Sequence, residues 1–276
     1  IDGHSILNRA FYGIPMLTNH EGIHTNAIYG FINIMLRAME DEKSDHIAVA
    51  FDLKAPTFRH KMYEMYKGTR KPMPAELHEQ VPVIKEILAS MNIPVITLEG
   101  YEADDILGTV GKKAQSLGYN VVILSGDRDL LQLADEHIKI RLPKTIKGRT
   151  EIENYYPEDV MEKYMATPSE FIDLKALMGD SSDNIPGVPG IGEKTAMSII
   201  SKYHSIENAY EHVEELTPAK AKNSLRENYD LAKLSKVLAT IETDAPVEFN
   251  IEDSAIGNIF TKEAYELFLS LIHISE

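Results

Sequence analysis

Residues 121–129 read Val-Val-Ile-Leu-Ser-Gly-Asp-Arg-Asp, a short apolar run followed by Asp127 and Asp129. Other apolar runs in the chain also end in acids, and these are Asp2, Asp52, Glu102, Asp104 and Asp105. The carboxyl ends of parallel strands share one edge of a sheet, so we expect these side chains to converge there. Clustered carboxylates, without cysteine or paired histidine, favour hard cations such as Mg²⁺ or Mn²⁺. The sequence therefore predicts a metal-dependent enzyme.

The composition is that of a globular protein rather than a small disulfide scaffold. The chain has 276 residues, 43% of them hydrophobic, and no cysteine, which excludes disulfides and thiolate zinc. No segment approaches the roughly 20 consecutive apolar residues that span a bilayer, and the start lacks a secretory signal. We therefore expect a cytoplasmic protein with no membrane partner. Because the chain begins with Ile1 rather than Met, we also expect residues upstream of it.

The net charge of −15 argues at first against a nucleic-acid partner. Bound cations would offset much of the acidic cluster, however, and the basic residues are bunched in segments 59–71, 194–204 and 220–226. Each basic run also fits an ordinary solvated helix face, so charge alone leaves both interpretations open.

The first part of the chain alternates strand and helix signals. Helices are expected at 25–40, 75–91, 102–117 and 128–133, and strands at 47–51, 93–98, 121–124 and 138–142. This rhythm predicts an α/β fold with a mostly parallel central sheet flanked by helices. We assign residues 1–156 to this core.

From residue 157 onward the pattern changes to short helices. They are expected at 157–164, 168–178, 193–203, 206–213, 218–226 and 231–240. We assign residues 157–276 to a C-terminal helical lobe.

A glycine-rich stretch joins two of these helices. Asp180 and Asp183 are three residues apart, a spacing that can turn both carboxylates to one side, and Gly187-Val-Pro-Gly-Ile-Gly192 follows. The spacing matches neither a dinucleotide fingerprint nor a Walker loop. Glycines there would let backbone N–H groups approach a phosphate, which predicts a helix-hairpin-helix DNA-binding motif around 179–203. The alternative is a glycine C-cap between two helices.

Six motifs in this order resemble the 5′ nuclease (5′-3′ exonuclease) domains of bacterial DNA polymerase I enzymes, within the flap endonuclease family. They are Ile-Asp-Gly-His (1–4), Ala-Phe-Asp (50–52), Tyr-Lys-Gly-Thr-Arg (66–70), Gly-Tyr-Glu-Ala-Asp-Asp (100–105), Ser-Gly-Asp-Arg-Asp (125–129) and the stretch 179–192. The resemblance covers nearly the whole chain. It implies a structure-specific 5′-3′ exonuclease and 5′-flap endonuclease that acts in RNA primer removal and DNA repair.

The resemblance also implies two Mg²⁺ or Mn²⁺ ions in one active site. It places Asp2, Asp52, Glu102 and Asp104 around one ion with Asp105 adjacent, and it assigns Asp127, Asp129, Asp180 and Asp183 to the second. Two such ions can generate hydroxide from water and stabilise the attacking and leaving oxygens. For Asp105 the alternative is a non-catalytic role, because acids in a first helical turn favour the helix dipole.

Basic and aromatic residues complete the implied site. Lys67 and Arg70 match catalytic cations on a mobile helical arch around 54–74, and Tyr66 could stack on a base near the cut. Arg9, in the loop expected after Asp2, resembles a phosphate contact, with an ordinary surface arginine as the alternative. The duplex would be held by the hairpin residues, which in this family also bind K⁺: Gly187, Gly190, Gly192, Lys194 and Thr195.

The implied partner is branched or nicked double-stranded DNA with a 5′ flap or an RNA primer. We expect a monomer in the bacterial cytoplasm, associated with the nucleoid. Whether a covalently fused polymerase region follows stays open, because residues 272–276 do not match the family's continuation. Two other classes compete: a non-catalytic DNA-junction binder, and a phosphatase or glycosyltransferase that uses only Asp127 and Asp129.

Overall fold

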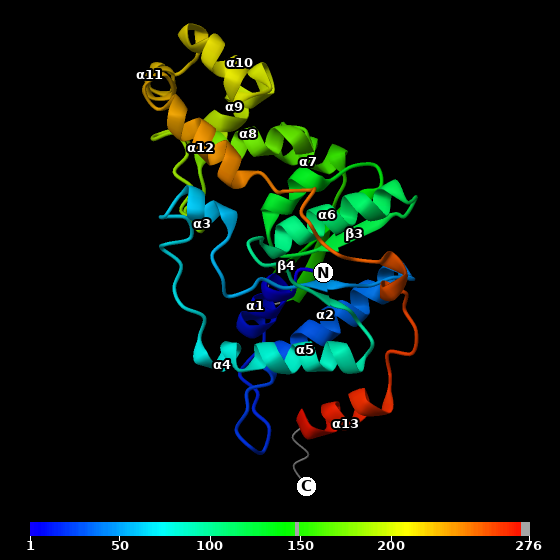
Figure 1. Ribbon diagram of the computed structural model, residues 1–276. Helices are drawn as coiled ribbons and strands as arrows, with labels where there is room; N and C mark the ends of the chain where they lie inside the picture. Colours follow the sequence, from blue (N-terminus) through cyan, green and yellow to red (C-terminus); the bar gives the residue numbers. More distant parts are fainter. Residues whose placement is uncertain (147–148, 272–276) are drawn as a thin grey trace.

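The computed structural model of the chain describes residues 1–146 and 149–271 (Figure 1). The tail at 272–276, which the family pattern did not match, lies outside the described residues. The strands are β1 (Val49–Ala50), β2 (Val95–Ile96), β3 (Val121–Leu124), β4 (Ile138–Ile146) and β5 (Arg149–Tyr155). β1 pairs with β2 and β3 pairs with β4, both in parallel.

The first two residues connect these two strand pairs into one layer. Asp2 forms a parallel bridge with Ala50 of β1, and its N–H donates to the carbonyl of Leu124 in β3 at 2.9 Å. The carboxyl ends of β1 and β3 therefore lie on either side of Asp2. This arrangement matches the predicted parallel sheet and fixes the edge at which the acids emerge.

β5 runs antiparallel to β4 and was not predicted. Its sequence, Arg-Thr-Glu-Ile-Glu-Asn-Tyr, contains no apolar run, so the pattern gave no strand signal. β4 also extends beyond its predicted end at residue 142. The central layer is thus mostly parallel, with one antiparallel edge.

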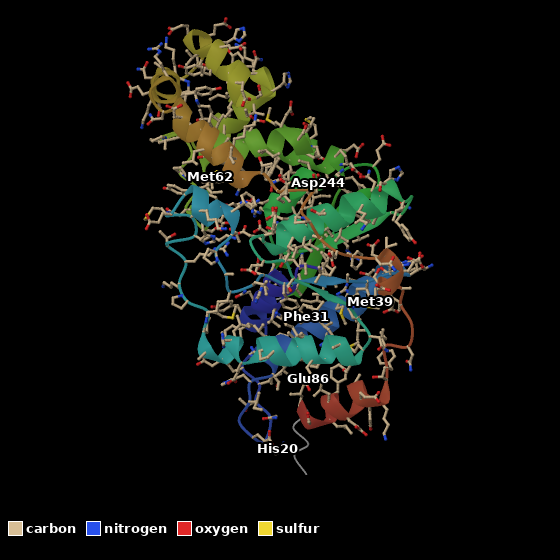
Figure 2. All side chains as sticks on the ribbon, viewed as in Figure 1. His20, Phe31, Met39, Met62, Glu86 and Asp244 are labelled. Carbon is tan, nitrogen blue, oxygen red and sulfur yellow. The ribbon has the colours of Figure 1, made fainter. Side chains whose placement is uncertain are left out.

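Four helices cover the sheet: α1 (Gly3–Gly13), α2 (Asn26–Glu42), α5 (Gln80–Ser90) and α6 (Ala103–Ser116). Phe31 of α2, labelled in Figure 2, is fully buried among apolar residues that include Ile84 of α5. The predicted helix at 75–91 divides into α4 (Ala75–His78) and α5, because Pro82 has no N–H to donate to the carbonyl of His78.

The expected loop after Asp2 is wrong, since these residues form α1. The Asp2 carboxylate caps this helix by accepting the N–H of Ser5 at 3.0 Å. Arg9 therefore projects from a helix.

The segment 54–74 is also less helical than predicted. It contains α3 (Phe58–Met62) and continues through turns and extended chain toward α4; Met62 is labelled at the end of α3 in Figure 2. Its central part is docked on the turn after α8: the N–H of Lys67 donates to the carbonyl of Asp183 at 2.8 Å, and Asn184 donates to the carbonyl of Met65 at 2.6 Å. In this structure the segment is a docked loop rather than a helical arch.

The C-terminal lobe consists of short helices, with α9, α10 and α11 farthest from the sheet (Figure 1). Their bounds are α7 (Pro157–Tyr164), α8 (Pro168–Met178), α9 (Glu193–Tyr203), α10 (Ile206–Glu211), α11 (Ala219–Glu227) and α12 (Tyr229–Ala239). They match the predicted helices to within a few residues.

The last described residues return to the α/β core. Helix α13 (Lys262–Leu271) lies beside α5, and its Ala264 is buried in the core of α1, α2 and α5 (Figure 1). The predicted division at residue 156 stays a prediction. None of the helices in the described part of the chain is long and apolar enough to cross a membrane.

Candidate metal and nucleic-acid site

Strand ends and hydrogen bonds place the first acids beside each other. The buried Ser125 hydroxyl donates to the Asp2 carboxylate at 2.6 Å and accepts the N–H of Asp127 at 3.0 Å. Asp127 in turn caps the 3₁₀ helix η1 (Arg128–Leu133) by accepting the N–H of Asp129 at 2.9 Å. The loop after β3 is therefore locked against the start of α1, which brings acids from distant parts of the sequence together.

Asp104 is the acid without a protein partner. It is half-buried in the first turn of α6, and no described residue makes a hydrogen bond or an ion pair with its carboxylate. Burial raises the pKa of Asp104 well above its usual value. The charges of Asp127, Asp2 and Asp52 raise it further, and the charge of Lys67 opposes this rise. We call Asp2, Asp52, Asp104 and Asp127 the open acid group.

Two other members of the open acid group, Asp2 and Asp52, have shifted pKa values, and the two shifts have opposite directions. Burial raises the pKa of Asp2 to about 6, with added repulsion from Asp52 and Asp127, against hydrogen bonds from Ser125 and Ser5. Burial would also raise the pKa of Asp52, but hydrogen bonds from His4 and from the N–H of Ala103 outweigh it, and the pKa falls to about 2. Asp52 is therefore ionised at neutral pH, whereas Asp2 and Asp104 gain from any nearby cation.

The remaining acids that face the site are held by cations of the chain. Lys67 Nζ lies 2.8 Å from Glu102 Oε1 and 3.7 Å from Asp183 Oδ2, and Arg70 pairs with Asp183. Burial would lower the pKa of Lys67, but the Glu102 and Asp183 charges raise it above its usual value. The two predicted basic residues thus lie at the acids.

A further cation, Lys175 of α8, was missed. Its Nζ lies 2.7 Å from Asp129 Oδ1 and also pairs with Asp180. Burial raises the pKa of Asp129 to about 7, helped by Asp127 and opposed by Lys175. The signal was present in the sequence, because a lysine inside an otherwise buried helix requires a partner. We call Glu102, Asp129, Asp180 and Asp183 the paired acid group.

Asp180 and Asp183 lie close together, since the Ser182 hydroxyl is 2.5 Å from Asp180 Oδ1 and 3.5 Å from Asp183 Oδ1, but helical spacing is not the cause. They lie in the turn after α8, where Asp180 pairs with Lys175 and Asp183 with Arg70. A spacing of three residues aligns side chains only on a helix, and α8 has already ended at Met178.

The nine acids that the resemblance divides between two ions do not form a preassembled metal site. Within residues 1–146 and 149–271, no three His, Asp or Glu side chains stand at the spacing of a metal site. The donor set nevertheless suits a hard cation: it consists of carboxylate oxygens, with the unpaired Asp104 among neighbours of like charge. The residues present therefore fit Mg²⁺ or Mn²⁺ best at the open acid group.

Asp105 is a correction to the predicted ligand set. Its carboxylate accepts two hydrogen bonds from Arg59 at 2.8 Å each and one each from the N–H groups of Glu102 and Glu242, at 3.0 and 2.9 Å. The side chain is fully buried. Because its oxygens are used within the protein, Asp105 anchors α3 and the chain after α12 to α6 and does not face a metal.

Tyr66 is a second correction. Its ring is 3% exposed and meets the His60 ring edge-on at 5.2 Å between centroids. Its hydroxyl donates to Glu102 at 3.0 Å. A ring in this position cannot stack on a base.

The hairpin glycines divide into two kinds. Gly187 has a φ of +61° and packs directly on the backbone of Gly179, while its N–H donates to the Ser235 hydroxyl at 2.9 Å. Its predicted phosphate contact is therefore wrong. Gly190 and Gly192 are exposed.

The first turn of α9 follows this hairpin and begins at Glu193. It carries the exposed Lys194 and the half-buried Thr195. The N–H groups of a first helical turn have no intrahelical acceptor, so this end of the hairpin can still meet a phosphate.

Arg9 is half-buried on α1 and lines a cavity of about 220 Å³ with Asn33 and Arg37 of α2. Burial lowers the pKa of Arg9. A cavity of about 490 Å³ lies at the acids themselves and extends from Asp127 past Lys175 to Glu193. Another, of about 500 Å³, lies around Ile1 and is lined by none of the acids of the open or paired group.

Acids at the carboxyl edge of an α/β sheet, next to basic side chains and a helical lobe, form an arrangement that suits a nuclease using divalent cations. Two family models match the chain: the N-terminal resolvase-like domain of 5′-3′ exonucleases over residues 1–165, and their C-terminal SAM fold over residues 166–262. The chain belongs to the 5′-3′ exonuclease family. This confirms the predicted family, fold class and enzyme class.

Curated relatives include DNA polymerase I of Bacillus caldotenax, 47% identical, and of Bacillus subtilis (strain 168), 49% identical, each over 271 residues. The match covers 98% of this chain but 31% of each relative, so the chain spans about a third of their length.

Similar solved structures include T5 5′-exonuclease with bound zinc, which has a TM-score of 0.71, 23% identity and 97% coverage of both chains. Another is the bacteriophage T5 flap endonuclease in a pseudo-enzyme-product complex with DNA and metal ions. It has a TM-score of 0.70 and 21% identity, and the match covers 98% of this chain and 97% of that one. These likenesses support the fold.

Proposed function

We propose that the chain hydrolyses phosphodiester bonds as a structure-specific 5′-3′ exonuclease and 5′-flap endonuclease that uses two Mg²⁺ or Mn²⁺ ions. The observation that carries the proposal is the unpaired Asp104 among the open acid group, with Lys67 held at Glu102 and Arg70 at Asp183. Bound divalent ions would activate water and stabilise charge on the phosphate oxygens.

The residues of the chain divide the remaining work. Asp2, Asp52, Asp104 and Asp127 would hold the cations, and the hydrogen bonds through Ser125 keep two of them in register. Lys175 holds Asp129 and Asp180 in place beside them, where a second ion would share these carboxylates.

Lys67 and Arg70 are positioned to exchange partners. Both now neutralise carboxylates, and a scissile phosphodiester would offer them another anionic acceptor, whose negative charge grows as the attacking oxygen approaches. Arg70 is half-exposed, so its guanidinium can turn toward a phosphate without unfolding the loop. These two cations would stabilise the negative charge that develops on the phosphate oxygens.

The duplex would lie along the helical lobe. Gly190, Gly192, Lys194 and Thr195 form the exposed end of the hairpin, where backbone N–H groups and one ammonium can grip a DNA backbone together with a K⁺ ion. We propose as substrates nicked or branched DNA with a 5′ flap or an RNA primer, cut during primer removal and repair in the bacterial cytoplasm, at the nucleoid. The chain would act as a monomer, joined to a polymerase region as in its relatives.

Cleavage of a labelled 5′-flap duplex in Mg²⁺, with product mapping, tests the proposal. We expect one product, cut one nucleotide inside the duplex junction, and we expect Asp127→Asn to abolish cleavage while preserving binding. Asp244→Asn is the matched control, because Asp244 is an exposed carboxylate beyond α12 (Figure 2). Tight binding without cleavage by the intact chain would favour a junction binder, and faster turnover of a small phosphomonoester would favour a phosphatase.

A further inference from the structure

Arg128 differs from the other cations of the site because it holds no carboxylate. It is exposed at the start of η1, and its guanidinium makes no hydrogen bond or ion pair with any of the residues that the structure describes. Lys67, Arg70 and Lys175 each neutralise acids. The five N–H donors of Arg128 therefore remain available to a ligand.

A buried hydroxyl without a partner lies close to Arg128. Tyr164 of α7 is 5% exposed, and no atom of the described residues accepts or donates a hydrogen bond at its hydroxyl. Burial raises the pKa of Tyr164, and the charge of Arg128 counteracts this rise, so the two groups lie within electrostatic reach. A buried hydroxyl without a partner destabilises the fold, and a bound ligand that accepts its hydrogen bond would remove this cost.

Both residues line the cavity of about 490 Å³ at the acids. Phe171 and Met178 give this cavity an apolar wall, and its far side reaches Glu193 at the start of α9. The cavity thus leads from the acids toward the glycine hairpin. A strand whose scissile linkage lies at the open acid group would pass through it on the way to the hairpin.

A backbone phosphate is the occupant that these donors fit. The planar guanidinium can bind two phosphate oxygens at once, and a neutral tyrosine hydroxyl can donate to a third acceptor or to the same oxygen. The apolar wall suits a sugar. Glu193 lines the end of the cavity nearest the hairpin. Its negative charge disfavours a phosphate at that end, so we place the phosphate at Arg128 and Tyr164.

We propose that Arg128 and Tyr164 form a phosphate subsite that binds one backbone phosphate of the substrate strand, on the helical-lobe side of the linkage that is cut. The subsite deepens the proposed nuclease function and rests on it. It would set the position of the strand in the site, whereas the acids carry the chemistry.

A series of substrates, each with one uncharged methylphosphonate linkage at a different position, tests this subsite. Flap duplexes that each carry one methylphosphonate near the junction are bound without divalent cation, and binding is followed by fluorescence anisotropy. For the wild type, we expect about a tenfold loss of affinity at the contacted linkage, the size of a charge-assisted hydrogen bond. In Arg128→Ala that loss should vanish, while losses at other linkages remain.

Two further readouts separate a direct contact from a structural effect. Arg128→Ala should lower the slope of log affinity against log salt by about one, as expected when one phosphate contact is lost. Tyr164→Phe should reduce the loss at the same linkage and at no other. Because Arg128 is exposed, its removal leaves the fold intact, which thermal unfolding checks.

Lys144→Ala is the matched control. Lys144 is an exposed lysine of β4 that pairs with Glu153 at 2.9 Å and does not line the cavity, so the loss of affinity at each linkage should stay that of the wild type. If Arg128→Ala shows the same loss of affinity at each methylphosphonate linkage as the wild type, the subsite is refuted, even if the wild type cuts flap DNA. A wild type that neither binds nor cuts flap DNA would overturn the proposed nuclease function instead.

Discussion

The open and the paired acid groups meet the same problem, several carboxylates in one place, in two different ways. In the paired group, Lys67, Arg70 and Lys175 supply the countercharge. In the open group Asp104 has no partner among the described residues, and its neighbours raise its pKa. Carboxylates that lack a basic partner, such as Asp104, thus lie beside carboxylates that the chain neutralises itself.

The pKa values follow this division only in part, because hydrogen bonds lower the pKa of Asp52 in the open group to about 2 and burial raises that of Asp129 in the paired group to about 7. Asp180 and Asp2 show the contrast that a basic partner makes. Burial would raise the pKa of Asp180, yet its bonds to Lys175 and Ser182 lower it to about 2. Asp2, also buried but lacking a basic partner, has a pKa of about 6. Among the open group, a bound cation should therefore stabilise Asp2 and Asp104 most, because their pKa values are raised. In the paired group, Lys67 and Arg70 should leave their carboxylates when a phosphate binds.

The largest effect should follow from Asp104→Asn. We expect cleavage of flap DNA to fall by about a thousandfold or more, because a ligand that stabilises the reacting charge is lost. Thermal stability without metal should rise, since the change removes repulsion from three neighbouring carboxylates. Single-turnover rates and melting curves measure the two effects. Normal cleavage by Asp104→Asn would contradict the proposed role of the open acid group in holding the cations.

The adjacent Asp105→Asn should behave in the opposite way. Replacing this carboxylate breaks a buried ion pair with Arg59, which costs about 3 kcal/mol or more of unfolding free energy. Urea denaturation measures this loss. If Asp105→Asn keeps full stability but loses Mg²⁺ affinity, Asp105 belongs with the metal ligands after all.

In the paired group, Lys67→Ala should slow the chemical step about a hundredfold. Duplex binding should change much less, because the hairpin and the phosphate subsite are untouched. Single-turnover cleavage and anisotropy separate the two quantities, with Lys61→Ala, an exposed lysine on α3, as the control. Unchanged single-turnover rates would assign Lys67 a role confined to closing the loop over Glu102.

The smallest effect concerns pH. Without divalent cations, the unfolding free energy should fall as pH rises from about 4 to about 7, because burial holds the pKa of Asp2 at about 6 and of Asp129 at about 7. In this window the native state binds more protons than the unfolded chain. The lowered pKa values of Asp52 and Asp180 add stability that is lost only at lower pH, as the pH falls from 3.8 toward about 2.

Melting curves at both ends of this window, with and without Mg²⁺, test the prediction. Added Mg²⁺ should raise the melting temperature more at the upper pH, where the carboxylates are ionised. A metal-free melting temperature that climbs with pH through the window would contradict the assigned shifts.

The sequence predicted those features that local chemistry determines. The helix at 168–178 has its predicted bounds, because Thr167 caps it and Pro168 occupies its first position. The acids emerge together because strand direction and sheet topology fix which edge they share.

What the sequence could not show depends on distant partners. Nothing near Asp105 reveals that Arg59 takes up its oxygens, and the motif around Gly187 does not show that its N–H is used by Ser235. β5 lacked a signal because its stability comes from pairing with β4 rather than from an apolar run. Lys175 could have been found from its position in a buried helix.

The contact between Gly179 and Gly187 sets a limit on how this region can vary. A methyl group on Gly179 would come within 2.6 Å of the carbonyl oxygen of Ile185, so any side chain there would force the intervening turn apart. That turn carries Asp180 and Asp183 and receives the docked loop. The close contact between these two glycines thus fixes the position of the turn that carries the acids. Mutational scanning should find Gly179 and Gly187 less replaceable than the exposed Ser181 and Ser182 between them.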